Sequence, residues 1–546
     1  MRKYRLIILG TLLLAVSGCQ PHIKPETPEE PEETAWWDEG STIYGTVSCS
    51  GAPLEGVIVS DGAVVTVTDA AGHYQMASAK GYGSVFVSVP SGYQAVSDGI
   101  LPKFYHNCTA DAAAAEKADF ELVKVDQSHS RVLLFGDIHL ASRTFCNDIG
   151  QYRGFMAEVS GLAAGSSCPV YGLTLGDMSW DYYWGANNYG LLDYLNETKK
   201  GLSGLQLFHT MGNHDNDPSA TGDAAGELLY RNVIGPGHYS FNVGGVHFIV
   251  LDSMLYLNDP LGQRNFLAKV SDEQISWMVE DIAHVPHKTP IVVAMHTPLY
   301  RKDGSSALGN LWDLIKHFEG YDYVQFVTAH MHVIYNVDML KRSVHVFECN
   351  SGAVCGAWWM TADACKSGLQ LCSDGSPSGY RILDIDGGAI SWKYKATGED
   401  ENMQFRAYDR NELCLSAEKW LPNASAEDRK AFLESAGDYA RPDSGNEVLI
   451  NVWDYDPSWT ISITENGKTL NVKQLKNVRD PLYLAVYESY EYNHGYSVSY
   501  PSSLTDHIFS VTASAPDSSL EIKVTDRFGR MYGCTMSRPQ AFVEPK

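Results

Sequence analysis

Five apolar segments in the middle of the chain each end at a short polar motif. VLLF runs into GDIH, YGLTL into GDMSWD, LQLFHTM into GNHD, IVVAM into HTP, and YVQFVT into AHMH. Such segments predict buried strands, and the amphipathic stretches 272–283 and 311–318 predict helices between them. Strands that alternate with helices form an α/β domain, in which ligands bind beyond the carboxyl ends of the strands. The sequence therefore predicts one polar site at that edge of an α/β domain.

The polar residues of these motifs are of the types that bind metal ions. Asp137 and His139 are two residues apart, so an extended backbone points both to one side. The carboxylate of Asp177 has two oxygens and can bridge two cations. Asn213 can offer its amide oxygen, which leaves His214 free to move protons. The full set of candidate ligands is Asp137, His139, Asp177, Asn213, His296, His330 and His332.

In order, the motifs D-x-H, G-D, G-N-H-D, H and [GA]-H-x-H resemble those of the calcineurin-like metallophosphoesterases. The match runs from about Arg131 to Asp386 and implies an αββα layered sandwich. One departure is Ala329, where the family usually has glycine, and we expect it to disturb backbone geometry more than ligation. The resemblance implies a first metal held by Asp137, His139, Asp177 and His332, and a second held by Asp177, Asn213, His296 and His330.

The resemblance also implies a reaction. A hydroxide that bridges two metal ions would attack the phosphorus of a phosphate mono- or diester, because coordination lowers the pKa of bound water. His214 would protonate the leaving group or stabilise the transition state. Imidazole and carboxylate ligands suit Mn, Fe or Zn, and the identity of the metals stays open.

Two other functions are consistent with the same residues. In the first, the flanking β-rich regions carry the function, and the chain is a surface-displayed binding protein with a vestigial metal centre. Alternatively, the metals act on an amide or on another ester. Isolated histidines such as His209 and His345 are assigned no role.

Aromatic and basic residues near the motifs are candidates for substrate binding. Tyr183, Trp184, Trp358 and Trp359, with Tyr182 beside them, are candidates for a wall that stacks on a sugar or base, although packing between loops is the more frequent use of such residues. Three arginines are possible phosphate clamps, with surface placement expected for each: Arg143, Arg153 and Arg301.

The flanks of the α/β domain have the alternating pattern of β-strands. Residues 41–125 predict a β-sandwich that resembles carboxypeptidase-regulatory-like domains. Residues 130–390 form the α/β domain, 391–445 a partly helical connector, and 446–546 a second β-sandwich, with NEVLINVWDYD, PLYLAVYE and LEIKVTDRFG among its strands. The flanks resemble the accessory domains of a bacterial lipoprotein subgroup of the family. The expected fold is therefore multidomain, with two all-β sandwiches around a central α/β domain.

The first nineteen residues resemble a lipoprotein signal peptide. Arg2, Lys3 and Arg5 precede an apolar run, and Val16-Ser17-Gly18-Cys19 resembles a lipobox, in which Cys19 is acylated. Residues 20–40 are rich in Pro and Glu and predict a solvated tether. We expect an exported protein, anchored by lipid to the periplasmic or surface side of a bacterial membrane.

The net charge of the chain narrows the choice of binding partners. The net charge of −25 over 546 residues excludes a general nucleic-acid binder. The expected substrate is a phosphorylated small molecule, glycan or lipid head group, and the oligomeric state is open.

An exported chain with ten cysteines besides Cys19 permits disulfides. Plausible pairs are Cys49 with Cys108, and pairs among Cys349, Cys355, Cys365 and Cys372.

Overall fold

The computed structural model describes residues 36–259, 265–361 and 369–542. The chain divides into two units, Met1–Glu39 and Gly40–Lys546. Cys19, most of the 20–40 segment and Cys365 lie outside the described residues. Within the described ranges, none of the helices combines the length and apolarity needed to cross a bilayer.

The N-terminal region of the second unit contains two β-sheets packed face to face, and a separate two-stranded sheet of β8 and β9. One sheet has the order β11-β1-β12-β7, with β2 and β5 paired to β1, and the other has the order β10-β6-β3-β4. Val47 and Phe120 from the first sheet and Val87 from the second are buried in one core, as alternation predicts for a sandwich. The strands are β1 (Ile43–Cys49), β2 (Ala52–Pro53), β3 (Ile58–Ser60), β4 (Val65–Val67), β5 (His73–Met76), β6 (Ser84–Val87), β7 (Tyr93–Ala95), β8 (Ser97–Asp98), β9 (Leu101–Pro102), β10 (Tyr105–Asn107), β11 (Glu116–Lys117) and β12 (Phe120–Lys124).

The central region contains two mixed sheets. The order of the first is β15-β14-β13-β24-β25, and that of the second is β16-β17-β20-β21-β23-β22. The strands that precede the polar motifs are parallel to one another within each sheet: β13, β14 and β15 in the first sheet, and β20 and β21 in the second. The strands are β13 (His129–Phe135), β14 (Val170–Thr174), β15 (Gln206–Phe208), β16 (Tyr239–Val243), β17 (Val246–Val250), β18 (Met254–Tyr256), β19 (Phe266–Ala268), β20 (Ile291–Ala294), β21 (Val324–Thr328), β22 (Tyr335–Lys341), β23 (Val344–Asn350), β24 (Gly379–Asp386) and β25 (Ala389–Ala396).

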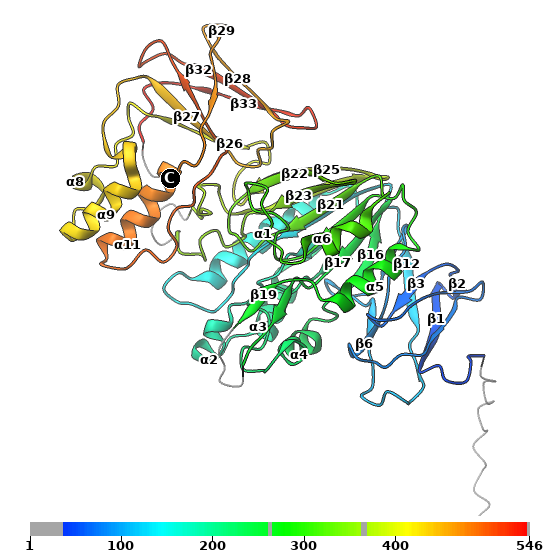
Figure 1. Cartoon of the computed structure of the whole chain (residues 1–546). Helices are drawn as coiled ribbons and strands as arrows, with labels where there is room; N and C mark the ends of the chain where they lie inside the picture. The colour runs from blue at the N-terminus through cyan, green and yellow to red at the C-terminus, as the bar shows by residue number, and fades with distance from the viewer. Residues whose placement is uncertain (1–35, 260–264, 362–368, 543–546) are drawn as a thin grey trace, which may run out of the picture. The chain divides into compact units, whose positions relative to one another are not determined.

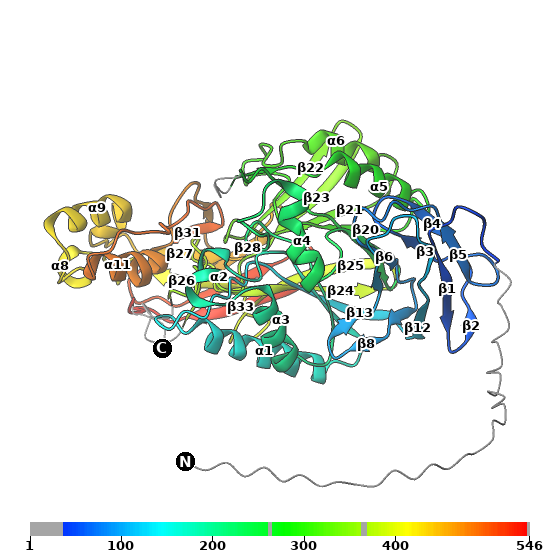
Figure 2. The ribbon, with the colours of Figure 1, turned by 90° about the horizontal axis from the view of Figure 1, so that it is seen from below.

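Helices cover the outer faces of these two sheets. Leu134 on the first sheet and Val293 on the second lie in one core between the sheets, whereas Leu133 and Phe135 face a separate core with the helix residue Phe155. Figure 2 shows α1 and α3 side by side, and Figure 1 shows α5 and α6 alongside the second sheet. The helices of this region are α1 (Asp148–Gly165), η1 (Asp181–Tyr183), α2 (Trp184–Asn187), α3 (Leu191–Gly201), α4 (Asp223–Val233), α5 (Asp272–Ile282), α6 (Leu311–Ile315) and η2 (Lys316–Phe318). The αββα layering implied by the motifs is confirmed.

The C-terminal region adds another pair of sheets, with the orders β26-β27-β31-β30 and β29-β28-β32-β33. Val448, Ile450 and Ile522 lie in the core between them. Beside this sandwich, α8, α9 and α11 pack together (Figure 1). The elements are β26 (Phe405–Asp409), α8 (Ala417–Trp420), α9 (Ala426–Ala436), η3 (Gly437–Ala440), β27 (Glu447–Val452), β28 (Thr460–Glu465), β29 (Lys468–Thr469), β30 (Lys473–Gln474), α10 (Pro481–Tyr483), η4 (Leu484–Glu488), α11 (Ser489–Asn493), β31 (Ile508–Thr512), β32 (Leu520–Thr525) and β33 (Met531–Met536).

One predicted strand of this region is wrong. The segment PLYLAVYE is helical, because Asp480 caps it by accepting from the backbone N–H groups of Leu482 and Tyr483, and Pro481 occupies the first turn. Residues 481–488 are all buried, so the run is apolar on every side and has no strand alternation to detect.

The loop that follows β23 belongs to two cores at once. Ala357 and Leu371 come from this loop, yet they are buried in one hydrophobic cluster with Phe432 and Tyr483 of the C-terminal region. Two nearby loop residues, Val354 and Cys355, lie instead in the core under the first sheet. The loop therefore joins the C-terminal region to the central domain.

The expected disulfides are wrong for the cysteines that the structure describes. The free thiols are Cys49, Cys108, Cys146, Cys168, Cys349, Cys355, Cys372, Cys414 and Cys534. Cys49 ends β1 and Cys108 follows β10, and these strands belong to different sheets of the sandwich. Cys349, Cys355 and Cys372 are buried and behave as small core residues.

Candidate metal centre

All seven predicted ligands lie just beyond the carboxyl ends of parallel strands. Asp137 and His139 follow β13, Asp177 follows β14 and Asn213 follows β15. The remaining three follow strands of the second sheet: His296 follows β20, and His330 and His332 follow β21. The fold thus brings residues from two sheets to one place.

One group of ligand atoms gathers around Asp137. The Nε2 atom of His332 lies 3.5 Å from Asp137 Oδ1 and 3.0 Å from Nε2 of His139. His139 Nε2 is also 3.4 Å from Asp177 Oδ2. The potential ligand atoms of Asp137, His139 and His332 all lie within 4.8 Å of one another.

A second group gathers on the other side of Asp177. The Nε2 atom of His296 lies 3.1 Å from Asp177 Oδ2 and 3.1 Å from Asn213 Oδ1. His330 Nδ1 is 3.1 Å from His296 Nε2. Asp177, His296 and His330 again form a set within 4.8 Å, so Asp177 lies between the two groups.

The chemistry of this donor set fits divalent cations. Burial lowers the pKa of His139 well below its usual value, that of His330 to about 3 and that of His332 to about 4, so these imidazoles are neutral and can bind metal. Among the described residues, none donates a hydrogen bond to the buried Oδ1 atom of Asp137. A buried carboxylate oxygen without a donor is costly, and a cation at that position would remove the cost.

The ligand residues are held in an uncommon backbone conformation. Asp137, His139, Asp177, His330 and His332 have φ angles of 51°, 49°, 57°, 73° and 52°. The left-handed region costs an L-residue about 1–2 kcal/mol, and such strain concentrates at functional sites. The neighbouring packing must therefore hold these loops in place.

Small residues allow the strand-end loops to approach one another. A Cβ atom at Gly212 would lie 2.4 Å from Asp177 Oδ1, and one at Gly176 would lie 2.6 Å from His296 Nδ1. Ala329 faces Gly136, whose absent Cβ would lie 2.8 Å from the Ala329 methyl group. The methyl group of Ala329 thus has room because the residue it faces, in the loop after β13 of the other sheet, is glycine.

Backbone carbonyls orient two of the ligand rings. The Nδ1 atoms of His296 and His332 each lie 2.7 Å from a carbonyl oxygen, of Leu175 and Gly356 respectively. An N–H at Nδ1 that donates to a carbonyl leaves the Nε2 lone pair for a metal ion. Both Nε2 atoms face the ligand groups described above.

His214 lies at the edge of this cluster and is partly exposed. Its Nδ1 is 2.7 Å from Oδ1 of Asp181, and its backbone N–H donates to Asp177 Oδ1 at 2.8 Å. Burial lowers its pKa, although Asp177 and Asp215 act in the opposite direction. Sequence reasoning did not single out Asp181. The feature that could have identified Asp181 is its position as the last residue of GDMSWD, four positions after Asp177.

Asp215 is the second residue that sequence reasoning left without a role. It is fully buried, and its carboxylate accepts from the backbone N–H groups of Asp177, Met178, Ser179 and Gly212. It therefore joins the loop after β14 to the loop after β15. The sequence places it at the end of the GNHD motif, but its backbone partners depend on the tertiary fold.

The predicted aromatic residues occupy different environments. Trp359 is buried and donates from Nε1 to the carbonyl of Ile138 at 2.7 Å. Trp184 donates from Nε1 to Ser179 Oγ at 3.0 Å. The ring centroids of Tyr183 and Trp180 are 5.2 Å apart.

Two aromatic residues lie closer to His332 and His214. Trp358 stacks on His332 at 3.9 Å between ring centroids. Tyr182 is 66% exposed, with its ring 5.5 Å from that of His214. Of the aromatic residues considered, Tyr182 thus combines an exposed ring with proximity to His214.

The surface placement expected for Arg143 is wrong. Its side chain is buried, pairs with Asp148 at 3.3 Å and donates to the carbonyl of Trp358 at 3.0 Å. These contacts hold two loops together. Arg153 and Arg301 are exposed, as expected.

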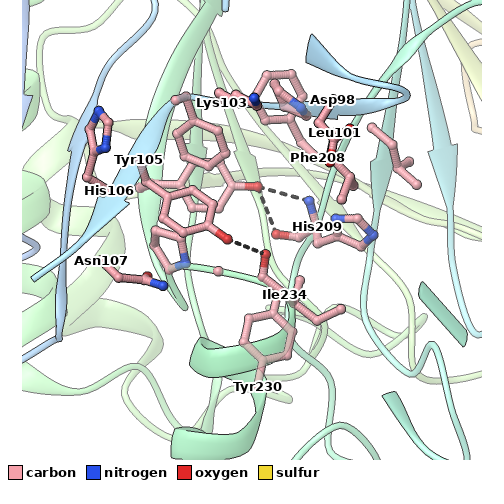
Figure 3. Close-up of a pocket in the computed structure, with 16 residues that line it drawn as sticks. Asp98, Leu101, Lys103, Tyr105, His106, Asn107, Phe208, His209, Tyr230 and Ile234 are labelled. Atoms are coloured by element: carbon pink, nitrogen blue, oxygen red, sulfur yellow. Dashed lines mark hydrogen bonds between the residues drawn. The ribbon is translucent and has the colours of Figure 1, made fainter. Parts of the chain in front are cut away.

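A cavity of about 310 Å³ lies elsewhere, at the contact between the N-terminal sandwich and the central domain (Figure 3). Tyr105, His209 and Tyr230 line it, and the Tyr105 hydroxyl donates to the carbonyl of Ile234. None of the predicted metal ligands is among its lining residues. Burial lowers the pKa of His209 to about 3, so this histidine is a neutral core residue.

Comparison with known proteins identifies the family. Residues 130–334 match the model of the calcineurin-like phosphoesterases, residues 41–125 match the N-terminal part of calcineurin-like phosphoesterases, and residues 348–532 match the C-terminal part. No curated protein matches the chain.

One solved structure with some similarity is GAP50, described as the anchor in the inner membrane complex of Plasmodium. It is 14% identical to this chain, the match covers 50% of this chain and 85% of GAP50, and the TM-score is 0.30. Another is Vps29 from Entamoeba histolytica complexed with zinc, with 11% identity over 48% of this chain and 98% of that one, and a TM-score of 0.21. The three family matches and the cluster of histidines and aspartates agree. The chain belongs to the calcineurin-like phosphoesterases that carry N- and C-terminal accessory domains, and it is a metal-dependent phosphoesterase.

Proposed function

We propose that the chain hydrolyses a phosphate mono- or diester with the help of two metal ions, drawn from Mn, Fe and Zn. The observation that carries this proposal is the position of Asp177. Its Oδ2 atom is 3.4 Å from His139 Nε2 and 3.1 Å from His296 Nε2, so one carboxylate lies between two groups of ligands. A carboxylate between two groups of ligands can bind one ion through each oxygen, which supports a two-metal site.

The ligands divide between the two positions as the geometry groups them. Asp137, His139, Asp177 and His332 would hold one ion, and Asp177, Asn213, His296 and His330 would hold the other. When bound, the ions would activate water at neutral pH and neutralise negative charge on the phosphate.

We assign proton transfer to His214. Asp181 fixes the ring through Nδ1, which leaves Nε2 to exchange a proton with the leaving oxygen. Burial lowers the pKa of His214 in the protein alone, and an anionic phosphate beside the ring favours the imidazolium again. Asp181 stabilises that charged form, because its carboxylate is 2.7 Å away.

The substrate and the location are proposals as well. A phosphorylated small molecule, glycan or lipid head group outside the cytoplasm is consistent with a net charge of −25 and with the lipobox-like segment at Cys19. A lipid on Cys19 would attach the protein to the membrane without a spanning helix.

The test uses purified protein that is stripped with a chelator and reloaded with Mn, Zn or Fe. We expect hydrolysis of an aryl phosphate monoester or diester that depends on added metal. His214→Asn should reduce the rate about 10²–10⁴-fold while the metal content is unchanged, because the variant loses only the proton donor. Asp177→Asn should lose both activity and metal. His345→Asn serves as the control, because His345 is exposed on β23 and pairs only with Asp338 among the interactions described.

Failure to hydrolyse either phosphate ester after reloading contradicts the proposal. If amide or carboxylic ester substrates are cleaved instead, the metals act on a different bond. If wild-type protein holds no metal, the binding-protein hypothesis is favoured.

A further inference from the structure

An aromatic side chain of the C-terminal region packs on Trp358, a neighbour of the metal centre. The ring of Tyr500 stacks on Trp358 with a centroid separation of 3.4 Å and an interplanar angle of 19°. Trp358 stacks in turn on the metal-ligand candidate His332, at 3.9 Å and 16°. Three rings from three segments of the chain thus form one column.

The two neighbours of Trp358 lie on its opposite faces. Both stacks are nearly parallel and centred on the indole at less than 4 Å, and two rings cannot share one face at these distances without overlap. Neither face of Trp358 is therefore free to stack on a substrate. Its role is to link His332 to Tyr500.

The C-terminal region fixes the position of Tyr500. The carbonyl of Tyr500 accepts from the hydroxyl of Tyr483 at 2.8 Å, and the backbone N–H of Ser502 donates to Glu488 at 2.7 Å. Both partners belong to the buried helical segment 481–488. Ser503, three residues after Tyr500, contacts the loop beside the metal centre, because its N–H donates to the carbonyl of Ser373 at 2.8 Å.

The loop that carries Trp358 needs such support. Trp358 and Trp359 have φ angles of 51° and 64°, and bulky residues rarely adopt this conformation. His332 has a φ angle of 52°, and the edge of its ring is held at Nδ1, which lies 2.7 Å from the carbonyl oxygen of Gly356. The stack on Trp358 adds a contact on its face.

We infer that Tyr500 is a positioning residue for the metal centre, which acts through Trp358 to hold the His332 ring in its ligating orientation. The C-terminal domain then takes part in metal binding. This inference rests on the proposed two-metal site for the role of His332, but it concerns affinity for metal and is independent of the bond that the enzyme breaks.

The test measures metal binding directly. Wild type, Tyr500→Phe, Tyr500→Leu and Tyr500→Ala are stripped and titrated with Co²⁺, whose absorption reports the ligand geometry, and with Mn²⁺ by electron paramagnetic resonance. Partners outside the ligand set typically change metal affinity 10–100-fold. We expect Tyr500→Ala and Tyr500→Leu to weaken one of the two binding events about tenfold or more and to alter the Co²⁺ spectrum.

Tyr500→Phe should bind like wild type, because it keeps the stacked ring. Tyr496→Ala is the matched control, because Tyr496 lies in the same segment and is 57% exposed. Tyr500→Leu retains apolar volume, so it separates loss of the stack from loss of packing if the alanine variant fails to fold.

Three results are decisive. Tyr500→Leu that folds and matches wild type in both affinity and Co²⁺ spectrum overturns the inference. Tyr500→Phe that is as defective as Tyr500→Ala also overturns it, because the stack would then not be the cause. If wild type binds two metals but cleaves no phosphate ester, the proposed function fails, and the affinities of the Tyr500 variants still decide the inference.

Discussion

The carboxylate of Asp215 accepts a hydrogen bond from the backbone N–H of Asp177 at 2.7 Å. The same carboxylate accepts from Gly212 and from two other residues of the loop after β14, so it fixes the distance between two ligand-bearing loops. An amide at this position would place N–H groups against backbone N–H groups. We expect Asp215→Asn to cost about 2–4 kcal/mol of unfolding free energy and to reduce metal content.

Denaturant unfolding and elemental analysis measure these two effects. Asp217→Asn is the control, because Asp217 is less buried and its side chain accepts from Ser219 only among the hydrogen bonds described. Equal stability and equal metal content in the two variants would show that Asp215 does not support the site.

Asp181 should affect catalysis without affecting metal content. Asparagine at this position keeps an oxygen for Nδ1 of His214 but removes the negative charge 2.7 Å away. The pKa of His214 should then fall, so we expect a lower rate and a shift of the His214-dependent limb of the pH profile to lower pH. A pH–rate profile with parallel metal analysis checks this. Asp193→Asn, an exposed helix-capping position, should leave the profile unchanged.

Glu348 makes stability depend on pH. Burial raises the pKa of this carboxyl from its ordinary 4.5 to about 7, although it accepts from Leu299, Tyr300 and Thr328. The folded protein therefore holds a proton that the unfolded chain has released, and stability falls as pH rises from 4.5 to 7, by up to roughly 3 kcal/mol. Glu348→Gln should remove this part of the slope.

Thermal unfolding of Glu348→Gln and wild type between pH 4.5 and 8 measures the difference. Glu319→Gln is a control on an exposed glutamate. Parallel slopes in Glu348→Gln and wild type would contradict the raised pKa.

Removal of metal should lower thermal stability. The ligand loops carry five left-handed residues and a carboxylate oxygen without a hydrogen-bond donor among the described residues. Ligands that bind only the folded state stabilise it, by about 2.7 kcal/mol at a hundred times Kd. We expect chelation to lower the unfolding temperature by several degrees, and Mn or Zn to restore it. A chelator that leaves the unfolding temperature of metal-loaded protein unchanged would be inconsistent with this coupling.

Lipid attachment is tested by changing one residue. If Cys19 carries the lipid, as proposed, Cys19→Ser should move the protein from the membrane fraction to the soluble extracytoplasmic fraction, because serine has no thiol to acylate. Fractionation followed by immunoblotting measures this. The Cys534→Ser variant, which changes an exposed thiol, should stay with the membrane. Retention of the Cys19→Ser protein in the membrane would favour an uncleaved signal segment or another anchor.

The sequence predicts which candidate ligands lie together, because each follows a strand that is recognisable by itself. Asp137, Asp177 and His296 sit at the ends of apolar runs, and parallel strands bring such ends together. Asp215 and Asp181 were missed as supports because their partners are backbone N–H groups and a ring in another loop. PLYLAVYE was misassigned because a helix buried on all sides has no periodic pattern. The contact of Tyr500 with Trp358 depends on tertiary packing alone.

The loop after β23 also bears on how such a protein can evolve. Val354 packs under the first sheet, while Ala357 and Leu371 fill the core of the C-terminal region. If the chain were divided after Asp386, the part with the central domain would have uncovered apolar loop residues, and the C-terminal part would have a void in its core. Exchange of the C-terminal domain between relatives would therefore have to carry this loop with it, and new specificities should arise by substitution within the joined unit.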